Sequence, residues 1–413
     1  MGTLNRRQFL KGCGCSALAW GTFPWLDLKA ASAAVGNGTK LLIVNLNGGW
    51  DGLSVLQPNS GALFSTLNAY RPTLIQSPSG LYSLGNGFGF AQQLSTFKNL
   101  YDEGSLLGIC NVGYRNMSRS HDESESVFAQ GASDRLHPVS SGFINRLGAQ
   151  YRWHSLQAVS VSGTERAFTG EQYRAVQVNG LQQYRFKTDR GVSAAENDYR
   201  RNELYLVSQA WPTDPHKPTQ ADVVGGVDLI NNTTDSLSDA VTAASYTYPY
   251  PNTDLGKKFQ DVDVLFSTSS LGTEVGYVRR GGFDSHSNQA AVLPSLLTEF
   301  NDALAAFVSN MKAKALWSNL IVLVISEFGR TNRENGSLGT DHGGAVPVFV
   351  MGGGVRGGQI IGEVLPTDLT DNGWLPMRFN IVDVYRSVFE RMGYDPNTVF
   401  QSSGDATVPA LFR

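Results

Sequence analysis

Short apolar segments separated by helical patterns are the feature that most narrows the folds open to this chain of 413 residues. Runs such as Ile-Val-Leu-Val-Ile at 321–325 are typical of strands buried on both faces of a parallel sheet. Strand-like segments lie at 41–46, 106–112, 156–161, 274–279, 320–325 and 346–351. Helical patterns occupy 120–131, 293–311 and 381–392. Strands that alternate with helices predict an α/β fold with a mostly parallel central sheet.

One long region departs from this alternation. Residues 163–260 are polar, rich in Thr, Asn, Asp and Tyr, and only weakly periodic. Their Tyr-Thr-Tyr-Pro-Tyr-Pro segment at 246–251 cannot form a regular helix, because proline and the residue before it resist helical geometry. We therefore predict a cap of helices and loops, inserted at about 163–260 into an α/β domain that spans 34–413.

The N-terminus has the features of an export signal in the expected order. A twin arginine at 6–7 precedes Phe-Leu-Lys at 9–11, a modest apolar run at 12–26 and Ala-Ser-Ala at 31–33. This order predicts a twin-arginine signal peptide at 1–33, the twin-arginine translocase as a partner, and a mature protein in the periplasm or outside the cell. The apolar run is shorter than the ~20 residues of a membrane span, so we do not expect an integral membrane protein.

Charge and cysteine content exclude one class of partner and one kind of covalent cross-link. The chain has 33 Lys and Arg against 36 Asp and Glu, a net charge of −3. This balance lacks the basic excess of nucleic-acid-binding proteins, so we expect no nucleic-acid partner. Two of the three cysteines lie in the predicted signal, which leaves Cys110 alone and excludes an intramolecular disulfide in the mature protein.

Acidic residues and histidines gather at the ends of the predicted strands, where parallel α/β sheets bind ligands. The motifs are Gly-Gly-Trp-Asp-Gly at 48–52, Gly-Phe-Asp-Ser-His-Ser-Asn-Gln at 282–289, Ser-Glu-Phe-Gly-Arg-Thr at 326–331 and Thr-Asp-His-Gly-Gly at 340–344. A fifth motif, Ser-Arg-Ser-His-Asp-Glu at 118–123, opens a predicted helix, whose positive end stabilises anions. Each motif alone has a structural explanation, such as a turn or a helix cap. Together they favour a divalent-ion site, because imidazole and carboxylate ligands suit zinc and manganese.

These motifs and the twin-arginine start resemble the exported bacterial family labelled domain of unknown function 1501 (DUF1501), over nearly the whole chain. That family is grouped with the alkaline phosphatase and sulfatase-like superfamily. The resemblance implies an alkaline-phosphatase-like three-layer sandwich, with a mostly parallel sheet, helices on both faces, and a two-metal site at the strand ends.

The resemblance also implies roles for individual residues. One divalent ion would be held by Asp51, Glu327 and Asp341, and the other by Asp284, His286 and His342. Ser120 stands at the nucleophile position, with Ser118, His121 or water as alternatives. Arg330 or Arg119 would bind the anion in a fork geometry. The superfamily has an Asp-His pair where this chain has Glu327 and Phe328, so one histidine ligand is missing unless Asp341 compensates.

The sequence therefore predicts an exported metal-dependent hydrolase of phosphate or sulfate esters, with an anionic small molecule or a glycan ester as substrate. It would use one or two ions of zinc, manganese, magnesium or calcium, and attack would come from Ser120 or from metal-bound hydroxide. The alternative is a non-catalytic exported protein of the same fold, used in cell-surface assembly or glycan binding. The missing histidine at Phe328 favours that alternative, and the other intact motifs favour the enzyme.

Overall fold

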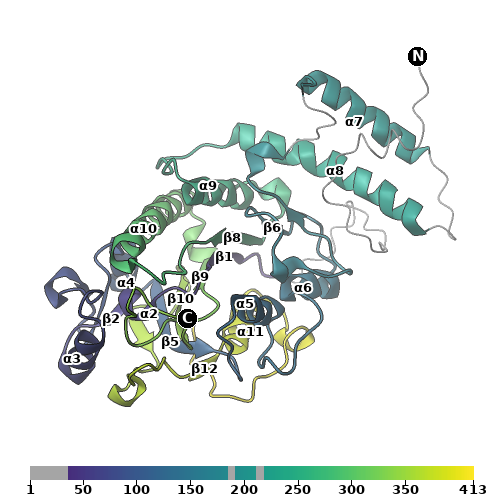
Figure 1. The fold of residues 1–413 in the computed structure, drawn as a ribbon. Helices are drawn as coiled ribbons and strands as arrows, with labels where there is room; N and C mark the ends of the chain where they lie inside the picture. The colour runs from purple at the N-terminus through teal and green to yellow at the C-terminus, as the bar shows by residue number, and fades with distance from the viewer. Residues whose placement is uncertain (1–35, 185–190, 211–217) are drawn as a thin grey trace.

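A mixed β-sheet forms the centre of the molecule (Figure 1). The computed structural model describes residues 36–184, 191–210 and 218–413. Within these residues the central sheet has nine strands in the order β11-β5-β10-β9-β1-β8-β6-β7, and β12 also pairs with β5. Strand β10 is antiparallel to both of its neighbours, β9 and β5, and the other pairings in the sheet are parallel.

The main strands lie where the apolar segments predict them, each end within two residues. Their bounds are β1 Lys40–Leu46, β5 Leu106–Gly113, β6 Ala158–Ser160, β8 Val275–Arg280, β9 Leu320–Ile325 and β10 Val346–Met351. Three short strands complete the sheet: β7 Val176–Gln177, β11 Gln359–Ile361 and β12 Phe379–Asn380. Every residue of β5, β9 and β10 is buried, as expected for strands that are covered on both faces.

Helices cover both faces of this sheet. Successive side chains of a strand point to opposite faces, so Leu42 and Val44 belong to one apolar core while Leu41 and Ile43 belong to the other. The first core includes side chains of α4 Ser95–Asp102, α9 Asp254–Ser267 and α10 Gln289–Ala313. The second includes side chains of α5 His121–Gln130, α6 Phe143–Tyr151 and α11 Ile381–Arg391. The predicted three-layer α/β sandwich with a mostly parallel sheet is confirmed (Figure 1).

Smaller elements are attached to this sandwich. A second sheet has the strand order β2-β4-β3. Its strands are β2 Leu56–Pro58, β3 Tyr82–Ser83 and β4 Phe88–Phe90, and the helices near it in sequence are α2 Gly52–Val55 and α3 Gly61–Tyr70. Short 3-10 helices lie at Pro78–Gly80, Arg166–Phe168, Leu181–Gln183, Ser269–Leu271, Trp317–Asn319, Pro366–Asp368 and Pro396–Thr398.

The region predicted as a cap has parts with different surroundings. Helices α7 Ala194–Gln209 and α8 Pro218–Ala243 pack against each other and project from the sandwich (Figure 1). Strand β7, by contrast, is the outermost strand on one side of the central sheet. Helix α9 packs against α10 in the apolar core. The projecting part of the region is therefore the pair of helices α7 and α8.

Helix α10 is the one described helix that is long and apolar enough to cross a membrane by length and composition. Its apolar side chains, among them Leu293, Phe300 and Leu304, are buried in the first core. We therefore assign α10 as a core helix of the sandwich. The predicted twin-arginine signal lies outside the described residues.

The strand directions bring five loops to one edge of the sheet. Strands β1, β8 and β9 are parallel and in register, with Leu46 opposite Arg280 and Asn45 opposite Ile325, so the loops that follow them leave at the same edge. The loop after β5 leaves there as well. Because β10 runs the other way, the loop that precedes it reaches this edge too. All five polar motifs thus lie near one another.

Candidate metal centre

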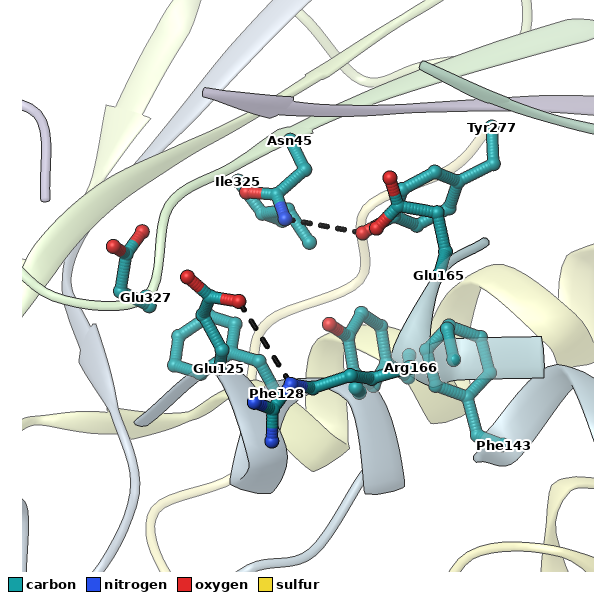
Figure 2. A pocket seen from close by; sticks show the side chains of 12 residues that line it. Asn45, Glu125, Phe128, Phe143, Glu165, Arg166, Tyr277, Ile325 and Glu327 are labelled. Carbon is teal, nitrogen blue, oxygen red and sulfur yellow. Dashed lines mark hydrogen bonds and ion pairs between the residues drawn. The ribbon is translucent and has the colours of Figure 1, made fainter. Parts of the chain in front are cut away.

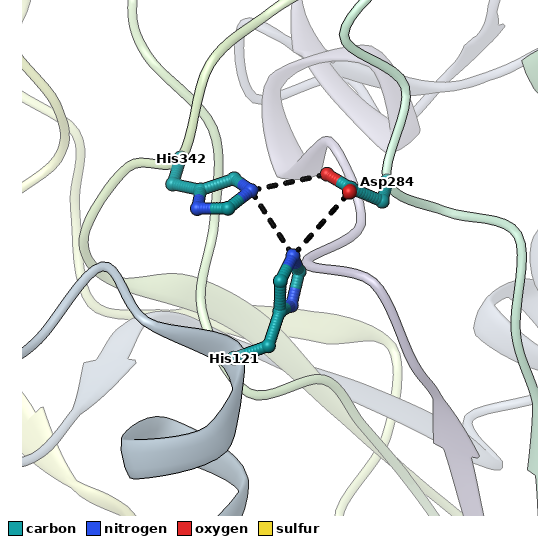
Figure 3. Close-up of side chains that lie close together, drawn as sticks. All are labelled: His121, Asp284 and His342. Atoms are coloured by element: carbon teal, nitrogen blue, oxygen red, sulfur yellow. Dashed lines mark hydrogen bonds and ion pairs between the residues drawn. The ribbon is translucent and has the colours of Figure 1, made fainter.

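Three histidines and one aspartate meet at this edge of the sheet. His121 is the first residue of α5, Asp284 and His286 follow β8, and His342 precedes β10. The Nε2 atom of His342 lies 3.0 Å from that of His121 and 2.8 Å from that of His286. Asp284 Oδ1 lies 3.1 Å from His342 Nε2 and 3.0 Å from His286 Nε2, and its Oδ2 lies 3.5 Å from His121 Nε2. Figure 3 shows His121, Asp284 and His342 pointing at one another.

The other ring nitrogen of each histidine faces an oxygen that can only accept a hydrogen bond. The three contacts are His121 Nδ1 to Glu327 Oε1 at 2.7 Å, His286 Nδ1 to Asp341 Oδ1 at 2.9 Å, and His342 Nδ1 to the carbonyl oxygen of Arg119 at 2.6 Å. A neutral ring in this setting carries its proton on Nδ1. Each neutral histidine therefore directs an unprotonated Nε2 toward the cluster.

This arrangement fits a divalent cation. Unprotonated nitrogens 2.8 to 3.0 Å apart repel each other unless a proton or a cation lies between them. Tetrahedral ligand bonds of about 2.0 Å place neighbouring ligand atoms about 3.3 Å apart. The separations of 3.0, 3.1 and 3.5 Å among His121, His342 and Asp284 are close to that spacing. Oxygen acceptors on the far ring nitrogens are also typical of metal-binding histidines.

The protonation of the cluster follows from its neighbours. The hydrogen bond from His121 to Glu327 raises the pKa of His121, against the effect of its partial burial. Burial lowers the pKa of His342, although the Arg119 carbonyl and Asp284 oppose this. Burial opposes the charge of Asp284, but Arg330 and the neighbouring histidines outweigh it and hold its pKa at about 2.

The predicted site residues divide into groups. Three of the six predicted metal ligands have their ligand atoms in the cluster, namely Asp284, His286 and His342. Glu327 and Asp341 instead accept hydrogen bonds from the far nitrogens of His121 and His286. His121, which was predicted as a catalytic residue, contributes the third imidazole of the cluster.

Glu327 anchors His121 from a buried position at the end of β9. Its Oε1 also accepts a hydrogen bond from the Gly48 amide at 2.9 Å. Burial opposes its charge, but the hydrogen bonds from His121 and Gly48 lower its pKa. A second group that could hold an ion consists of His121, Glu125 and Glu327. Because Arg279 already pairs with Glu125 at 3.0 Å, we assign this group a supporting role for His121.

Asp51 lies in a separate buried ion pair. Its Oδ2 is 2.6 Å from Arg71 Nη1, and both side chains are only 1% exposed. The same oxygen accepts hydrogen bonds from Ser54 and Gln289, each at 2.6 Å. Burial opposes the charge of Asp51, but Arg71 and these hydrogen bonds outweigh it and lower its pKa. The structure therefore places Asp51 in an ion pair that fixes Gln289, at the start of α10, rather than among the histidines.

Arg330 connects the loops of the site. Its buried guanidinium donates to the backbone carbonyls of Gly48, Gly49, Phe283 and Thr340 and, at 2.7 Å, to Asp284 Oδ1. These contacts hold the loops after β1, β8 and β9 together and orient the Asp284 carboxylate. The predicted role of anion binding would require this guanidinium to leave those partners.

The residues before His121 are more accessible. Ser120 is exposed and is the N-cap residue of α5, but its side chain does not cap the helix. Ser118, the alternative nucleophile, donates its hydroxyl hydrogen to Glu123 and accepts from the Ser120 amide at 3.1 Å. Arg119 is exposed, and its guanidinium lies 4.7 Å from the ring centre of Trp374. Ser120 and Arg119 are therefore the residues of this loop that face solvent beside His121.

Phe328 lies beneath two of the imidazoles. The centre of its buried ring is 4.8 Å from that of His121 and 4.9 Å from that of His342. The side chain thus packs against the cluster at the position where the family resemblance implies a histidine. Sequence reasoning missed that His121 supplies an imidazole to the same cluster. The available signal was its place at the start of a helix, directly after Ser120.

A small cavity lined by polar and apolar side chains lies next to Glu327 (Figure 2). Its volume of about 20 Å³ is enough for about one water molecule. The polar side chains that line it include Asn45, Glu125, Glu165 and Tyr277. Burial raises the pKa of Glu165 to about 7, although Arg279 opposes this. Glu125 and Glu327, which line the cavity, also lie close to His121.

Comparisons with solved structures show likeness at low sequence identity. The chain is similar to the lipoteichoic acid synthase LtaP from Listeria monocytogenes, with 8% identity and a TM-score of 0.35 over 90% of this chain and 74% of that one. It is also similar to the alkaline phosphatase from the Antarctic bacterium TAB5, with 12% identity and a TM-score of 0.34 over 78% and 94% of the two chains. The PsFucS1 sulfatase from Pseudoalteromonas sp. has 12% identity and a TM-score of 0.34 over 91% and 73%. No protein with a curated description matches this chain.

A family model assigns the chain more firmly than these likenesses do. The model described as "protein of unknown function (DUF1501)" matches residues 110–410. The match covers most of the chain and includes the loops that carry His121, Asp284, His286, Glu327 and His342. This chain belongs to the DUF1501 family.

Proposed function

We propose that this protein is an exported, metal-dependent hydrolase of phosphate or sulfate esters. The observation that supports this proposal is the convergence of three imidazoles whose Nδ1 atoms are all held by oxygen acceptors. Such a set is suited to binding a cation, and it lies at the edge of the sheet where α/β folds bind ligands.

His121, Asp284 and His342 would hold the ion, since their ligand atoms lie within 4.8 Å of one another. His286 Nε2, 2.8 Å from His342 Nε2 and 3.0 Å from Asp284 Oδ1, would supply a further ligand after a small movement of its ring. Zinc suits a set of imidazoles and one carboxylate best. A divalent ion at this position would act as a Lewis acid toward an ester oxygen.

The loop before His121 would supply the groups that act on the ester. Ser120 is adjacent to a ligand, lies at the positive end of α5, and keeps its side chain out of the helix cap. Its hydroxyl would attack the phosphorus or sulfur atom and lose its proton to solvent, the bond from that atom to the ester's bridging oxygen would break, and the alcohol would leave with a proton from water. A second water molecule would then hydrolyse the serine ester and release phosphate or sulfate. Arg119 would pair with the non-bridging oxygens, because Arg330 is occupied by backbone carbonyls.

Metal content and turnover together test this proposal. We expect protein purified without chelators to contain a transition metal by mass spectrometry, and His342→Ala to lose it along with turnover of 4-nitrophenyl phosphate or sulfate. Ser120→Ala should keep the metal and lose turnover, because the proposed ligands are His121, Asp284 and His342. His137→Ala is the matched control, since that ring is 80% exposed and pairs with Asp134.

Two results would contradict the proposal, and a third would change only the assignment of the nucleophile. Equal metal content in His342→Ala and the unmodified protein would remove the metal site. Bound metal with no turnover of any phosphate or sulfate ester would favour the non-catalytic alternative. Full turnover in Ser120→Ala would exclude Ser120 as the nucleophile.

A further inference from the structure

Two exposed apolar side chains lie near the loops that carry the candidate metal centre. Trp374 is 41% exposed and Leu338 is 50% exposed, whereas large apolar side chains of a core are normally buried. Trp374 neighbours the loop of His342, and Leu338 neighbours the loop of His286.

Trp374 is held against the backbone of the His342 loop. Its segment pairs with Thr331 in a β-bridge, and the Ala345 amide donates to the Leu375 carbonyl at 2.9 Å. A side chain at Gly344 would lie 2.2 Å from Trp374 Cδ1, so the indole edge rests directly on that glycine. Gly344 is two residues after His342, which places the indole beside a proposed metal ligand.

Arg119 connects this indole to the metal centre. Its backbone carbonyl holds His342 Nδ1 at 2.6 Å, and its guanidinium lies 4.7 Å from the centre of the Trp374 ring. Among the described residues, no carboxylate forms an ion pair with Arg119, whereas Arg330 pairs with Asp284 and Arg71 pairs with Asp51. The Trp374 ring therefore holds the exposed Arg119 guanidinium near the histidine cluster without neutralising its charge.

Leu338 lies in the loop that contacts the backbone of His286. Its backbone has φ of +59°, a left-handed conformation that is unfavourable for leucine. The loop is fixed there because the Leu338 carbonyl accepts from the Gln289 amide at 2.9 Å and the Asn335 side chain donates to the His286 carbonyl at 3.0 Å. The fold thus keeps an exposed leucine beside His286 at a conformational cost.

We propose that Arg119, Trp374 and Leu338 form a recognition site for esters in which the charged group is attached to a ring. This inference rests on the proposed function and names its substrate class. Arg119 pairs with the oxygens of the phosphate or sulfate group. The ring, aromatic or sugar, lies against the exposed parts of the indole and of Leu338. Small alkyl esters lack the ring and gain nothing from Trp374.

Phosphonates test this recognition without turnover, because their carbon–phosphorus bond is not an ester bond. We would measure binding of phenylphosphonate and methylphosphonate to the metal-loaded protein by calorimetry. We expect the phenyl compound to bind about fivefold more tightly, the factor that one aromatic contact supplies. Trp374→Ala should abolish this difference, and Arg119→Gln should weaken both ligands by about tenfold. Glucose 3-sulfate, compared with methyl sulfate in the Ser120→Ala variant so that neither ester is turned over, repeats the test for a sugar ring.

The controls separate this inference from the proposed function. Tyr248→Ala removes an aromatic residue that is 47% exposed and remote in sequence from the site loops, and should change neither ligand's affinity. Metal content is measured in each variant, so a lost site is not mistaken for lost recognition. Normal metal content with an unchanged phenyl-to-methyl ratio in Trp374→Ala would overturn the inference and leave the proposed function standing. If the protein binds no metal, the proposed function fails. The same titration of the metal-free protein then tests the recognition site alone, since a phenyl preference that Trp374→Ala abolishes would still support it.

Discussion

Replacing Asp51 by alanine distinguishes a structural ion pair from a metal ligand. In the structure its carboxylate pairs with Arg71 at 2.6 Å, whereas the family resemblance implies that it coordinates an ion. The two roles predict different losses. If Asp51 is an ion-pair partner, replacing it should lower the free energy of unfolding even when no metal is present. If it is a metal ligand, replacing it should lower the metal content.

The expected cost follows from burial. Both side chains are 1% exposed, so Asp51→Ala leaves the Arg71 guanidinium buried without its counter-charge. Breaking a buried pair in this way costs about 3–5 kcal/mol. Arg71 keeps hydrogen bonds to the Thr331 and Asn332 carbonyls, at 2.5 and 2.9 Å, so we expect the lower end, about 3 kcal/mol.

Urea unfolding of protein treated with a chelator measures this cost without any contribution from bound metal. We expect Asp51→Ala to lose about 3 kcal/mol in the free energy of unfolding. The double variant Asp51→Ala/Arg71→Met should recover most of it, because neither charge remains buried. Metal content of untreated Asp51→Ala should match that of the unmodified protein. A variant that loses its metal but unfolds at the same urea concentration when metal-free would refute this reasoning.

Two further predictions concern the buried cavity and the signal. The pKa of Glu165, ordinarily about 4.5, is about 7 in the folded protein, so the folded state loses stability relative to the unfolded state as pH rises from 4.5 to 7. Glu165→Gln should remove this loss, up to about 3 kcal/mol, and become more stable than the unmodified protein above pH 7 but not below pH 4.5 in thermal unfolding. Replacing Arg6 and Arg7 by lysine should block export, and normal arrival of that variant in the periplasm, measured by fractionation, would contradict the twin-arginine assignment.

The strands could be predicted from sequence because burial on both faces leaves a simple pattern. Strand β9 at Leu320–Ile325 is a continuous apolar run and was predicted to the residue. Strand β6 at Ala158–Ser160 is shorter than its apolar segment, because Val161 leaves the strand while remaining buried. The cap was harder to delimit, since the polar composition of 163–260 does not reveal that α9 packs in the core.

Sequence placed the polar motifs at one edge but did not determine which atoms face each other. Glu327 and His121 are 206 positions apart, and no spacing rule connects them. Arg330 resembles an anion-binding residue in the sequence, but burial and neighbouring carbonyls make it a connector of loops. These roles depend on the register of β1, β8 and β9 and on side-chain direction, which are properties of the assembled fold.

The loop after β9 acts on the histidine cluster without contributing a histidine to it. Where the family resemblance implies an Asp-His pair, this chain has Glu327 and Phe328. Both residues act on the same incoming ring: Glu327 accepts the Nδ1 proton of His121 at 2.7 Å, and the Phe328 ring lies 4.8 Å from its centre. The hydrogen bond fixes the tautomer, and the packing fixes the ring plane, so Nε2 is directed at His342 and Asp284. The loop after β9 thus orients the imidazole that α5 carries and contributes no imidazole of its own to the cluster.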